Sequence, residues 1–324
     1  MAKQYGPTDI KASAIELIGN TPLVALDRIW PGSGRILAKC EFMNPGASIK
    51  DRPSRCMIET AISNGKLQPN GHIVELSSGN QGCGLALVSA VLGHPLTIAM
   101  SEGNSPQRAV MMRALGAEVV LAKQVDGKPG NVTGADIGEV EVVAAEQTEK
   151  YHAYYVDQLN NEANSRAHEE TTGPEIWRQT GGRVAAFVTV VGTAGCFAGI
   201  SRYLKRQNPD VVCVAAEPTA AQAIKGEPMP NPLHLLQGSG YGMIPALFSY
   251  DTMDYTIDVT DEEALKYKDL LARKEGLYLG YTSGANVAAA VKLLESGKLP
   301  SDAWVVTLLN DTGLKYPPEA AHMS

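Results

Sequence analysis

Short apolar runs alternate along this chain with longer segments in which apolar residues recur every three or four positions. The short runs predict buried strands at residues 36–38, 72–76, 96–99, 119–121, 186–191, 211–216 and 304–309. The longer segments predict helices at residues 51–64, 85–92, 107–115, 198–207, 261–275 and 283–296. This alternation predicts an α/β fold with a mostly parallel sheet. In such folds ligands bind at the carboxyl ends of strands, where glycine-rich turns lead into helices.

The chain is long enough for two lobes. It has 324 residues, of which 44% are hydrophobic, so it can bury a large core. Residues 124–138 are rich in glycine, aspartate, proline and asparagine. We therefore expect a surface loop there, at the end of the first lobe.

Charge and composition exclude several classes of protein. The formal net charge is −7, and no basic run is interleaved with aromatic residues, which argues against nucleic-acid binding. The first ten residues lack a signal-peptide pattern, and no stretch approaches 18 apolar residues, so we expect a cytoplasmic protein that does not bind membranes. The five cysteines and six histidines show no CxxC or metal-ligand spacing, so no disulfide framework or metal site is predicted.

One lysine lies beside a turn of small residues. The segment Asn-Pro-Gly-Ala-Ser-Ile-Lys-Asp-Arg spans residues 44–52, and the helix predicted from residue 51 has Pro53 in its first turn. Lys50 therefore lies where a loop becomes a helix. A lone lysine at such a junction is otherwise a solvated charge, but here its amine could meet a ligand carbonyl.

Two glycine-rich loops follow predicted strands. Residues 75–84 offer hydroxyl, amide and free backbone N–H donors suited to a carboxylate, although a polar loop with a helix cap has the same composition. Residues 191–199 could bring several N–H groups onto one anion. That second loop also fits a dinucleotide fingerprint or a packing turn. We favour a monophosphate, because Glu217, the acidic residue at a suitable distance, precedes Pro218 instead of standing in a βαβ context.

A fourth segment, residues 280–286, places two neighbouring hydroxyl groups at a predicted helix start. Thr282 and Ser283 would ordinarily be helix caps. Beside an amine, an anion cup and a carboxylate loop, such a hydroxyl could instead bond a pyridine nitrogen without giving it a full positive charge.

Together these segments resemble those of the cysteine synthase and cystathionine β-synthase family, the β-replacement branch of the fold-type II enzymes that use pyridoxal 5′-phosphate (PLP). Residues 18–24, 158–164 and 171–177 also match, so the likeness covers nearly the whole chain. The resemblance implies a two-lobed, tryptophan synthase β-like fold. It implies a smaller mobile domain at 39–160, a larger PLP-binding domain formed by 1–38 and 161–324, and a homodimer.

The resemblance also implies roles for individual residues. Lys50 would tether PLP and act as the catalytic base, and Asn80 would bond its ring hydroxyl. The ring nitrogen would face Thr282, with Ser283 or Asp311 as alternatives. The phosphate would be held by Gly192, Thr193, Ala194, Gly195 and Cys196. The residues expected to bind the substrate are Ser77, Ser78, Asn80, Gln81, Gln158 and Tyr241.

The implied activity is that of a PLP-dependent transferase. It would replace the β-substituent of an activated serine (O-acetylserine, O-phosphoserine or serine) and give cysteine or a related β-substituted alanine. A β-elimination lyase or dehydratase of the same fold is the alternative, followed by a non-catalytic PLP-binding relative. Sulfide, homocysteine, thiosulfate, cyanide and an amine all fit as the small nucleophile.

Several positions depart from the family pattern. The phosphate loop usually reads Gly-Thr-Gly-Gly-Thr, whereas this chain has Ala194 and Cys196, so a hydroxyl is replaced by a poorly donating thiol. Ala47 stands where a second glycine is usual, and Gln81 where threonine is usual. Tyr241 resembles the residue of cystathionine β-synthases. The segment 310–316 resembles the ending of relatives that use other activated serines.

Overall fold

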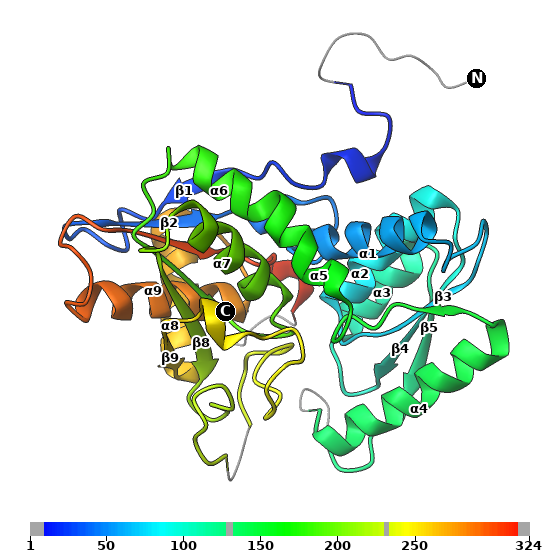
Figure 1. Ribbon diagram of the computed structural model, residues 1–324. Helices are drawn as coiled ribbons and strands as arrows, with labels where there is room; N and C mark the ends of the chain where they lie inside the picture. The colour runs from blue at the N-terminus through cyan, green and yellow to red at the C-terminus, as the bar shows by residue number, and fades with distance from the viewer. Residues whose placement is uncertain (1–9, 128–131, 230–232, 317–324) are drawn as a thin grey trace.

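The computed structural model describes residues 10–127, 132–229 and 233–316, and it contains two separate β-sheets flanked by helices (Figure 1). The larger sheet has six strands and the smaller has four. The predicted α/β class with mostly parallel sheets is therefore confirmed. No helix in these three ranges is both long and apolar enough to cross a membrane.

The six-stranded sheet has the order β1-β2-β10-β7-β8-β9, and only its β1–β2 pair is antiparallel. Its strands are β1 Leu23–Ala25, β2 Arg35–Lys39, β7 Ala186–Val190, β8 Val212–Pro218, β9 Tyr255–Val259 and β10 Trp304–Leu308. Successive residues of β7 enter two different cores, because side chains alternate across a sheet: Phe187 packs beside α7 (Gly195–Gln207), and Val188 beside α9 (Tyr281–Glu295). Helices therefore cover both faces, as parallel strands require.

The four-stranded sheet is parallel throughout and has the order β5-β4-β3-β6. Its strands are β3 Ile73–Leu76, β4 Leu96–Ser101, β5 Glu118–Ala122 and β6 Tyr154–Tyr155. The helices that pack on it are α1 Asp51–Ser63, α2 Asn80–Leu92, α3 Pro106–Ala114 and α4 Gly134–Tyr151. Residues of α1, α2 and α3 share one core with Ile73 and Ile98, whereas α4 covers the opposite face.

The remaining elements connect these two bodies or cap the larger one. They are α5 Glu162–Ala167, α6 Gly173–Gln179, α8 Asp261–Glu275, a π-helix η3 His168–Thr172, and the 3₁₀ turns η1 Ala14–Leu17, η2 Glu41–Met43, η4 Tyr250–Thr252 and η5 Gly313–Lys315. Helix α5 packs against α1 of the smaller body and α7 of the larger body, and Figure 1 shows it between them. The chain between the two sheets is thus itself part of the packed structure.

The structure corrects two of the predicted boundaries. The helix expected at 85–92 begins earlier, at Asn80, because the hydroxyl of Ser77 accepts hydrogen bonds from the backbone N–H groups of Gly79 and Gly82. The loop expected at 124–138 gives way at Gly134 to α4, whose capping box joins Thr133 and Asp136. That loop does not end the first lobe, since α4 and β6 still belong to the smaller body. Residues 128–131 lie outside the described chain.

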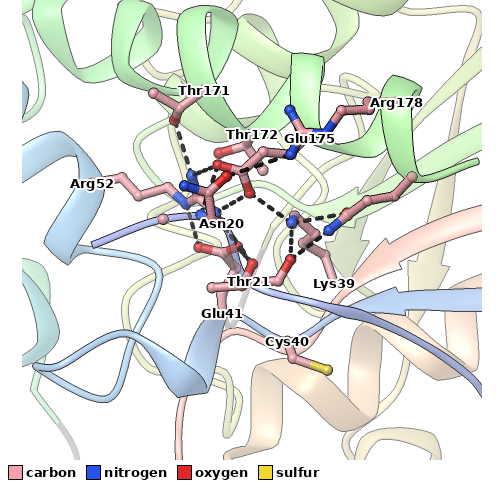
Figure 2. A network of polar contacts seen from close by, with 12 residues as sticks. Asn20, Thr21, Lys39, Cys40, Glu41, Arg52, Thr171, Thr172, Glu175 and Arg178 are labelled. Atoms are coloured by element: carbon pink, nitrogen blue, oxygen red, sulfur yellow. Dashed lines mark hydrogen bonds and ion pairs between the residues drawn. The ribbon is translucent and has the colours of Figure 1, made fainter. Parts of the chain in front are cut away.

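A network of four buried charges joins the two bodies next to the start of α1 (Figure 2). Arg52 binds two carboxylates side-on: its contacts with Glu41 are 2.7 and 2.8 Å, and both contacts with Glu175 are 2.8 Å. Lys39, at the end of β2, approaches the second of these carboxylates at 2.7 Å. All four residues are at most 5% exposed. Two positive and two negative charges thus neutralise one another away from water.

The network keeps its charges because every member has partners. Burial on its own would raise the pKa of Glu175, but the hydrogen bonds and charge of Arg52 lower it to about 2. Burial lowers the pKa of Lys39, and Glu175 opposes that shift. Removing one member would leave its partner charged in a site that water cannot reach.

We expect Arg52→Met to lower the free energy of unfolding by about 3–5 kcal/mol, because it leaves two buried carboxylates with one cation between them. Arg55→Met is the matched control on the same helix, since Arg55 pairs with Glu59 at the surface. It should cost less than about 1 kcal/mol. Urea denaturation of both variants measures the free energy of unfolding. If both lose the same amount, the buried network contributes no more to stability than a surface ion pair.

Candidate active site

Four predicted site segments lie at the carboxyl ends of parallel strands or at the helix starts beside them. The loop at 77–79 follows β3, and the loop at 191–194 follows β7 and leads into α7. The segment after β10 passes between the lysine turn and the start of α9, as backbone bridges from Ser48 to Asp311 and from Leu279 to Thr312 show. The sheet edges therefore bring these distant segments of the sequence together.

Lys50 precedes the first residue of α1, and within the described chain its amine makes no hydrogen bond or ion pair with another residue. Burial lowers the pKa of Lys50, and the nearby Cys196 thiol opposes this shift only in part. The amine is thus more easily deprotonated than an exposed lysine. A neutral amine can attack a carbonyl or accept a proton, which an ammonium group cannot do.

The turn before Lys50 is tightly constrained. Gly46 donates its N–H to Asp51, and a Cβ at Gly46 would lie 2.3 Å from an oxygen of that carboxylate. Ala47 has φ +56°, a left-handed conformation that alanine adopts at a cost. The glycine usual in related sequences would carry no such cost, so this departure has a structural consequence.

The loop after β3 has two of its polar side chains engaged with the protein. Ser77 caps α2, as described above, and Gln81 donates its amide to the Ser54 hydroxyl of α1 at 2.8 Å. The hydroxyl of Ser78 has no hydrogen-bond partner among the described residues. The backbone carbonyl of Ser78 accepts a hydrogen bond from Arg108 at 3.0 Å. Among the described residues, the hydroxyl of Ser78 and the backbone N–H groups of Asn80 and Gln81 therefore face no competing protein acceptor, whereas the N–H of Gly82 is taken by Ser77.

Asn80 and Gln158 border the same loop. The amide of Asn80 is held at both ends: its Nδ2 donates to Asp311 at 2.7 Å, and its Oδ1 accepts from Lys315 at 3.0 Å. Gln158 donates its side-chain amide to the carbonyl of Leu76 at 3.0 Å. Each amide keeps one N–H that these contacts leave unused.

The loop after β7 forms a cup at the N-terminus of α7. Ala194 has φ +68° and directly precedes the helix. A Cβ at Gly192 would lie 2.4 Å from the carbonyl of Gly238, and one at Gly195 would lie 2.2 Å from an oxygen of Asn164. The Asn164 amide also donates to the Thr193 hydroxyl at 3.0 Å. The helix start and its bare glycines can accept an anion close to the backbone.

Cys196 lies in the first turn of α7, near Lys50. Burial raises the pKa of Cys196 to about 12, although the charge of Lys50 opposes the shift. The side chain is therefore a neutral thiol at physiological pH. It offers an anion a much weaker hydrogen bond than the hydroxyl found in related sequences.

The three candidates for a ring-nitrogen partner differ in what they already bind. Ser283 is fully buried and accepts a hydrogen bond from the backbone N–H of Asn310 at 2.9 Å. Asp311 accepts from Asn80 and, at 2.9 Å, from the hydroxyl of Tyr316. Thr282 is half-buried, and its hydroxyl bonds to no other residue in the described ranges. Of these three side chains, Thr282 is the one with an uncommitted hydroxyl.

Tyr241 is 40% exposed and borders a shallow hollow next to Gly192, the first residue of the cup. Its loop carries further exposed apolar side chains, including Met243 and Ile244. In the described residues no group of three or more His, Cys, Asp or Glu side chains is arranged to hold a metal ion.

Comparisons with known proteins agree on one family. Residues 15–311 match the family described as pyridoxal-phosphate dependent enzyme. Cysteine synthase A of Escherichia coli is 42% identical over 305 residues, which cover 92% of this chain and 91% of that protein. The chain belongs to the PLP-dependent enzymes of the cysteine synthase and cystathionine β-synthase family.

Solved structures of this PLP family show the same fold. The O-acetylserine dependent cystathionine β-synthase of Helicobacter pylori has a TM-score of 0.86 at 32% identity, covering 97% of this chain and 99% of that one. A hydrogen sulfide-producing enzyme from Fusobacterium nucleatum has a TM-score of 0.86 at 32% identity, covering 96% and 99%. The predicted fold type II is therefore confirmed, and PLP is the cofactor of this family member.

The residues of this PLP enzyme fit the cofactor. An unpartnered amine of lowered pKa suits its aldehyde, the α7 cup suits its phosphate, and the uncommitted hydroxyl of Thr282 suits its ring nitrogen. Sequence reasoning missed Arg108, Asn164 and Lys315, which support the two loops and Asn80. Lys315 lies in the segment 310–316 that the sequence did single out, but its partner is 235 positions away.

We expect Ala47→Gly to stabilise the cofactor-free protein by about 0.5–1 kcal/mol. The substitution removes a left-handed strain of about 1–2 kcal/mol and adds about 0.5–1 kcal/mol of backbone entropy cost. Ala61→Gly, in the last turn of α1, is the control with the opposite sign and should destabilise, because it lowers helix propensity and removes a buried methyl group. Urea unfolding reports both values; a loss of stability in Ala47→Gly would mean that the turn is not strained.

Proposed function

We propose that this protein replaces the β-substituent of an activated serine, giving cysteine or a closely related β-substituted alanine. The observation that carries the proposal is the unpartnered amine of the half-buried Lys50, placed between a carboxylate loop and a phosphate cup. The reaction class, PLP-dependent β-replacement, is that of the relatives at 42% identity. When bound, PLP supplies an electron sink that allows an amino acid to lose its α-proton and its β-substituent.

Lys50 would have two functions in this reaction. Its amine would hold PLP until an amino acid displaces it, and the released amine would then take the proton from the α-carbon of the substrate. The lowered pKa of Lys50 supports both functions, because each needs the neutral amine. Desolvation shifts Lys50 toward that form, and no ion pair within the described chain favours the ammonium form.

The loop at 77–82 would bind the α-carboxylate. The Ser78 hydroxyl and the free N–H groups at the start of α2 are the donors that the protein leaves uncommitted, and a helix N-terminus favours an anion. We assign Ser77 and Gln81 to shaping this loop, because both make hydrogen bonds inside the protein. Asn80 and Gln158 would each contribute their remaining amide N–H.

Gly192 to Cys196 would hold the phosphate, and Thr282 would face the ring nitrogen. A neutral hydroxyl bonds this nitrogen without stabilising its protonated form as a carboxylate would. The cofactor then withdraws electrons less strongly, which favours loss of a β-substituent over transamination. Asp311 stays an alternative to Thr282, because its Oδ2 bonds Asn80 and Tyr316 while its buried Oδ1 has no hydrogen-bond partner among the described residues.

We also propose how the molecule is organised around this site. Residues 39–160 would move as the smaller domain and carry the 77–82 loop onto bound substrate, with Tyr241 at the opposite side of the entrance. The larger domain would comprise 1–38 and 161–324. The protein would be a cytoplasmic homodimer; a monomer in sedimentation at micromolar concentration would contradict the dimer.

β-Elimination is the second candidate function, because one structural relative is described as a hydrogen sulfide-producing enzyme. The two reactions differ in their products: replacement gives an amino acid, whereas elimination gives pyruvate and ammonia. To separate the two reactions, the enzyme is supplied with O-acetylserine, O-phosphoserine or serine, and its products are identified. Each substrate is tested with and without sulfide, homocysteine, thiosulfate, cyanide or an amine. Pyruvate formed at the same rate with every nucleophile would overturn the replacement proposal.

We expect Lys50→Ala to lose the absorbance of tethered cofactor and to reduce turnover by at least about 10²–10⁴-fold, since tether and base disappear together. Circular dichroism should show that the fold persists. Lys66→Ala, at an exposed position beyond the same helix, is the control and should retain both properties. Retained absorbance and turnover in Lys50→Ala would mean that another lysine holds the cofactor.

We expect Thr282→Asp to slow β-replacement and to increase transamination of amino acids without a leaving group, because a carboxylate favours a protonated ring nitrogen. Thr282→Ala should be milder, with a loss on the order of 1 kcal/mol for one neutral hydrogen bond. Product analysis and absorbance spectra measure both effects. If Ser283→Ala changes the spectrum while Thr282→Asp does not, the ring partner is Ser283.

A further inference from the structure

Lys315 is a buried lysine that contacts the predicted cofactor-binding residue Asn80. It ends η5, the short turn after β10, and is 5% exposed. Its amine donates to the Oδ1 atom of Asn80 at 3.0 Å and to the carbonyl of Gly46 at 2.6 Å. One side chain from the larger body therefore touches both the substrate loop and the lysine turn.

The two ends of the Asn80 carboxamide face partners of opposite kind. Lys315 can only donate hydrogen bonds, so it requires the Oδ1 atom. The Asp311 carboxylate accepts the Nδ2–H at 2.7 Å and is 1% exposed. A rotation of the amide by half a turn would set N–H against ammonium and oxygen against carboxylate. The pair thus fixes the rotation of Asn80 and leaves one N–H unused.

The segment that carries Lys315 is itself anchored to the smaller body. The backbone carbonyl of Lys315 accepts a hydrogen bond from the Ser105 hydroxyl at 3.3 Å. The ring of the next residue, Tyr316, lies under the guanidinium of Arg108 at 4.8 Å, and the same guanidinium donates to the carbonyl of Ser78. Lys315 therefore has little freedom to follow a misplaced Asn80.

We propose that Lys315 is a positioning residue for PLP binding: it holds the Asn80 carboxamide so that its unused N–H is available to the ring hydroxyl of the cofactor. This inference rests on the role proposed for Asn80. A freely rotating amide would present its oxygen to the ring hydroxyl part of the time. Loss of Lys315 should therefore weaken PLP binding through Asn80.

The test is a titration of the cofactor-free protein with PLP, followed by fluorescence, in a double-mutant cycle. We expect Lys315→Met to raise the dissociation constant about 2- to 12-fold, the range for one neutral hydrogen bond between Asn80 and the ring hydroxyl. Lys315→Arg should recover part of the affinity because it can still donate. In the Asn80→Ala background, Lys315→Met should cause no further loss.

The outcomes separate the inference from the assignment on which it rests. If Asn80→Ala leaves the dissociation constant unchanged, the proposed role of Asn80 is wrong. If Asn80→Ala weakens binding and Lys315→Met does not, the inference is overturned. It is also overturned if Lys315→Met weakens binding equally in both backgrounds, since Lys315 would then act through Gly46 or through general stability.

A half-buried lysine with similar hydrogen bonds controls for a general effect of removing a lysine contact. Lys292 also donates to one carbonyl, that of Asp258, and to one side chain, Glu263, both at 2.8 Å, but it lies near the far end of α9. Lys292→Met should leave PLP affinity unchanged. The absorption maximum of bound cofactor should shift in Lys315→Met and not in Lys292→Met, because only the former changes what faces the ring hydroxyl.

Discussion

The neutralisation of four buried charges positions Lys50, the lysine proposed to be catalytic. Arg52 follows Lys50 by two residues, and its bonds to Glu41 and Glu175 fix the first turn of α1 against η2 and α6. Within the network, the carboxylates of Glu41 and Glu175 form ion pairs with Arg52, and Glu175 also pairs with Lys39. Lys50, immediately beside the network, has no carboxylate partner, so burial lowers the pKa of its amine and Cys196 opposes that shift only in part. In the network, carboxylates offset the effect of desolvation on the cations. At Lys50 desolvation lowers the pKa and so favours the neutral amine, which is the reactive form.

The turns around this lysine carry backbone strain. Ala47 and Ala194 both adopt left-handed φ values, and at both positions the motif that the sequence resembles would have glycine. Ala194 is also buried, and its methyl group joins the core beside α7, so packing there offsets part of the strain. Strained residues persist where the surrounding structure holds them, and functional loops are frequent sites of such strain.

Local patterns predicted much of this molecule. The strand runs, the lysine turn and the two glycine-rich loops could be recognised because each depends on neighbouring residues. The helix α4 was missed because its apolar face, including Val140 and Ala144, is short and its cap lies in a polar stretch. The charge network and the hold on Asn80 could not be predicted, since Arg52 and Glu175 are 123 positions apart and Asn80 and Asp311 are 231 apart.

The central claim is that Lys50, and none of the more deeply buried lysines, holds PLP. Lys39, Lys268 and Lys315 are each at most 5% exposed. Lys39 and Lys315 already bind carboxylate, amide or carbonyl oxygens, and the amine of Lys268 lies over the rings of Tyr278 and Tyr281. Borohydride reduction of the holoprotein makes the bond between lysine and cofactor permanent, and peptide mass spectrometry then locates it. We expect the added mass on the peptide that contains Lys50. The same mass on Lys39, Lys268 or Lys315 would contradict the assignment of the site.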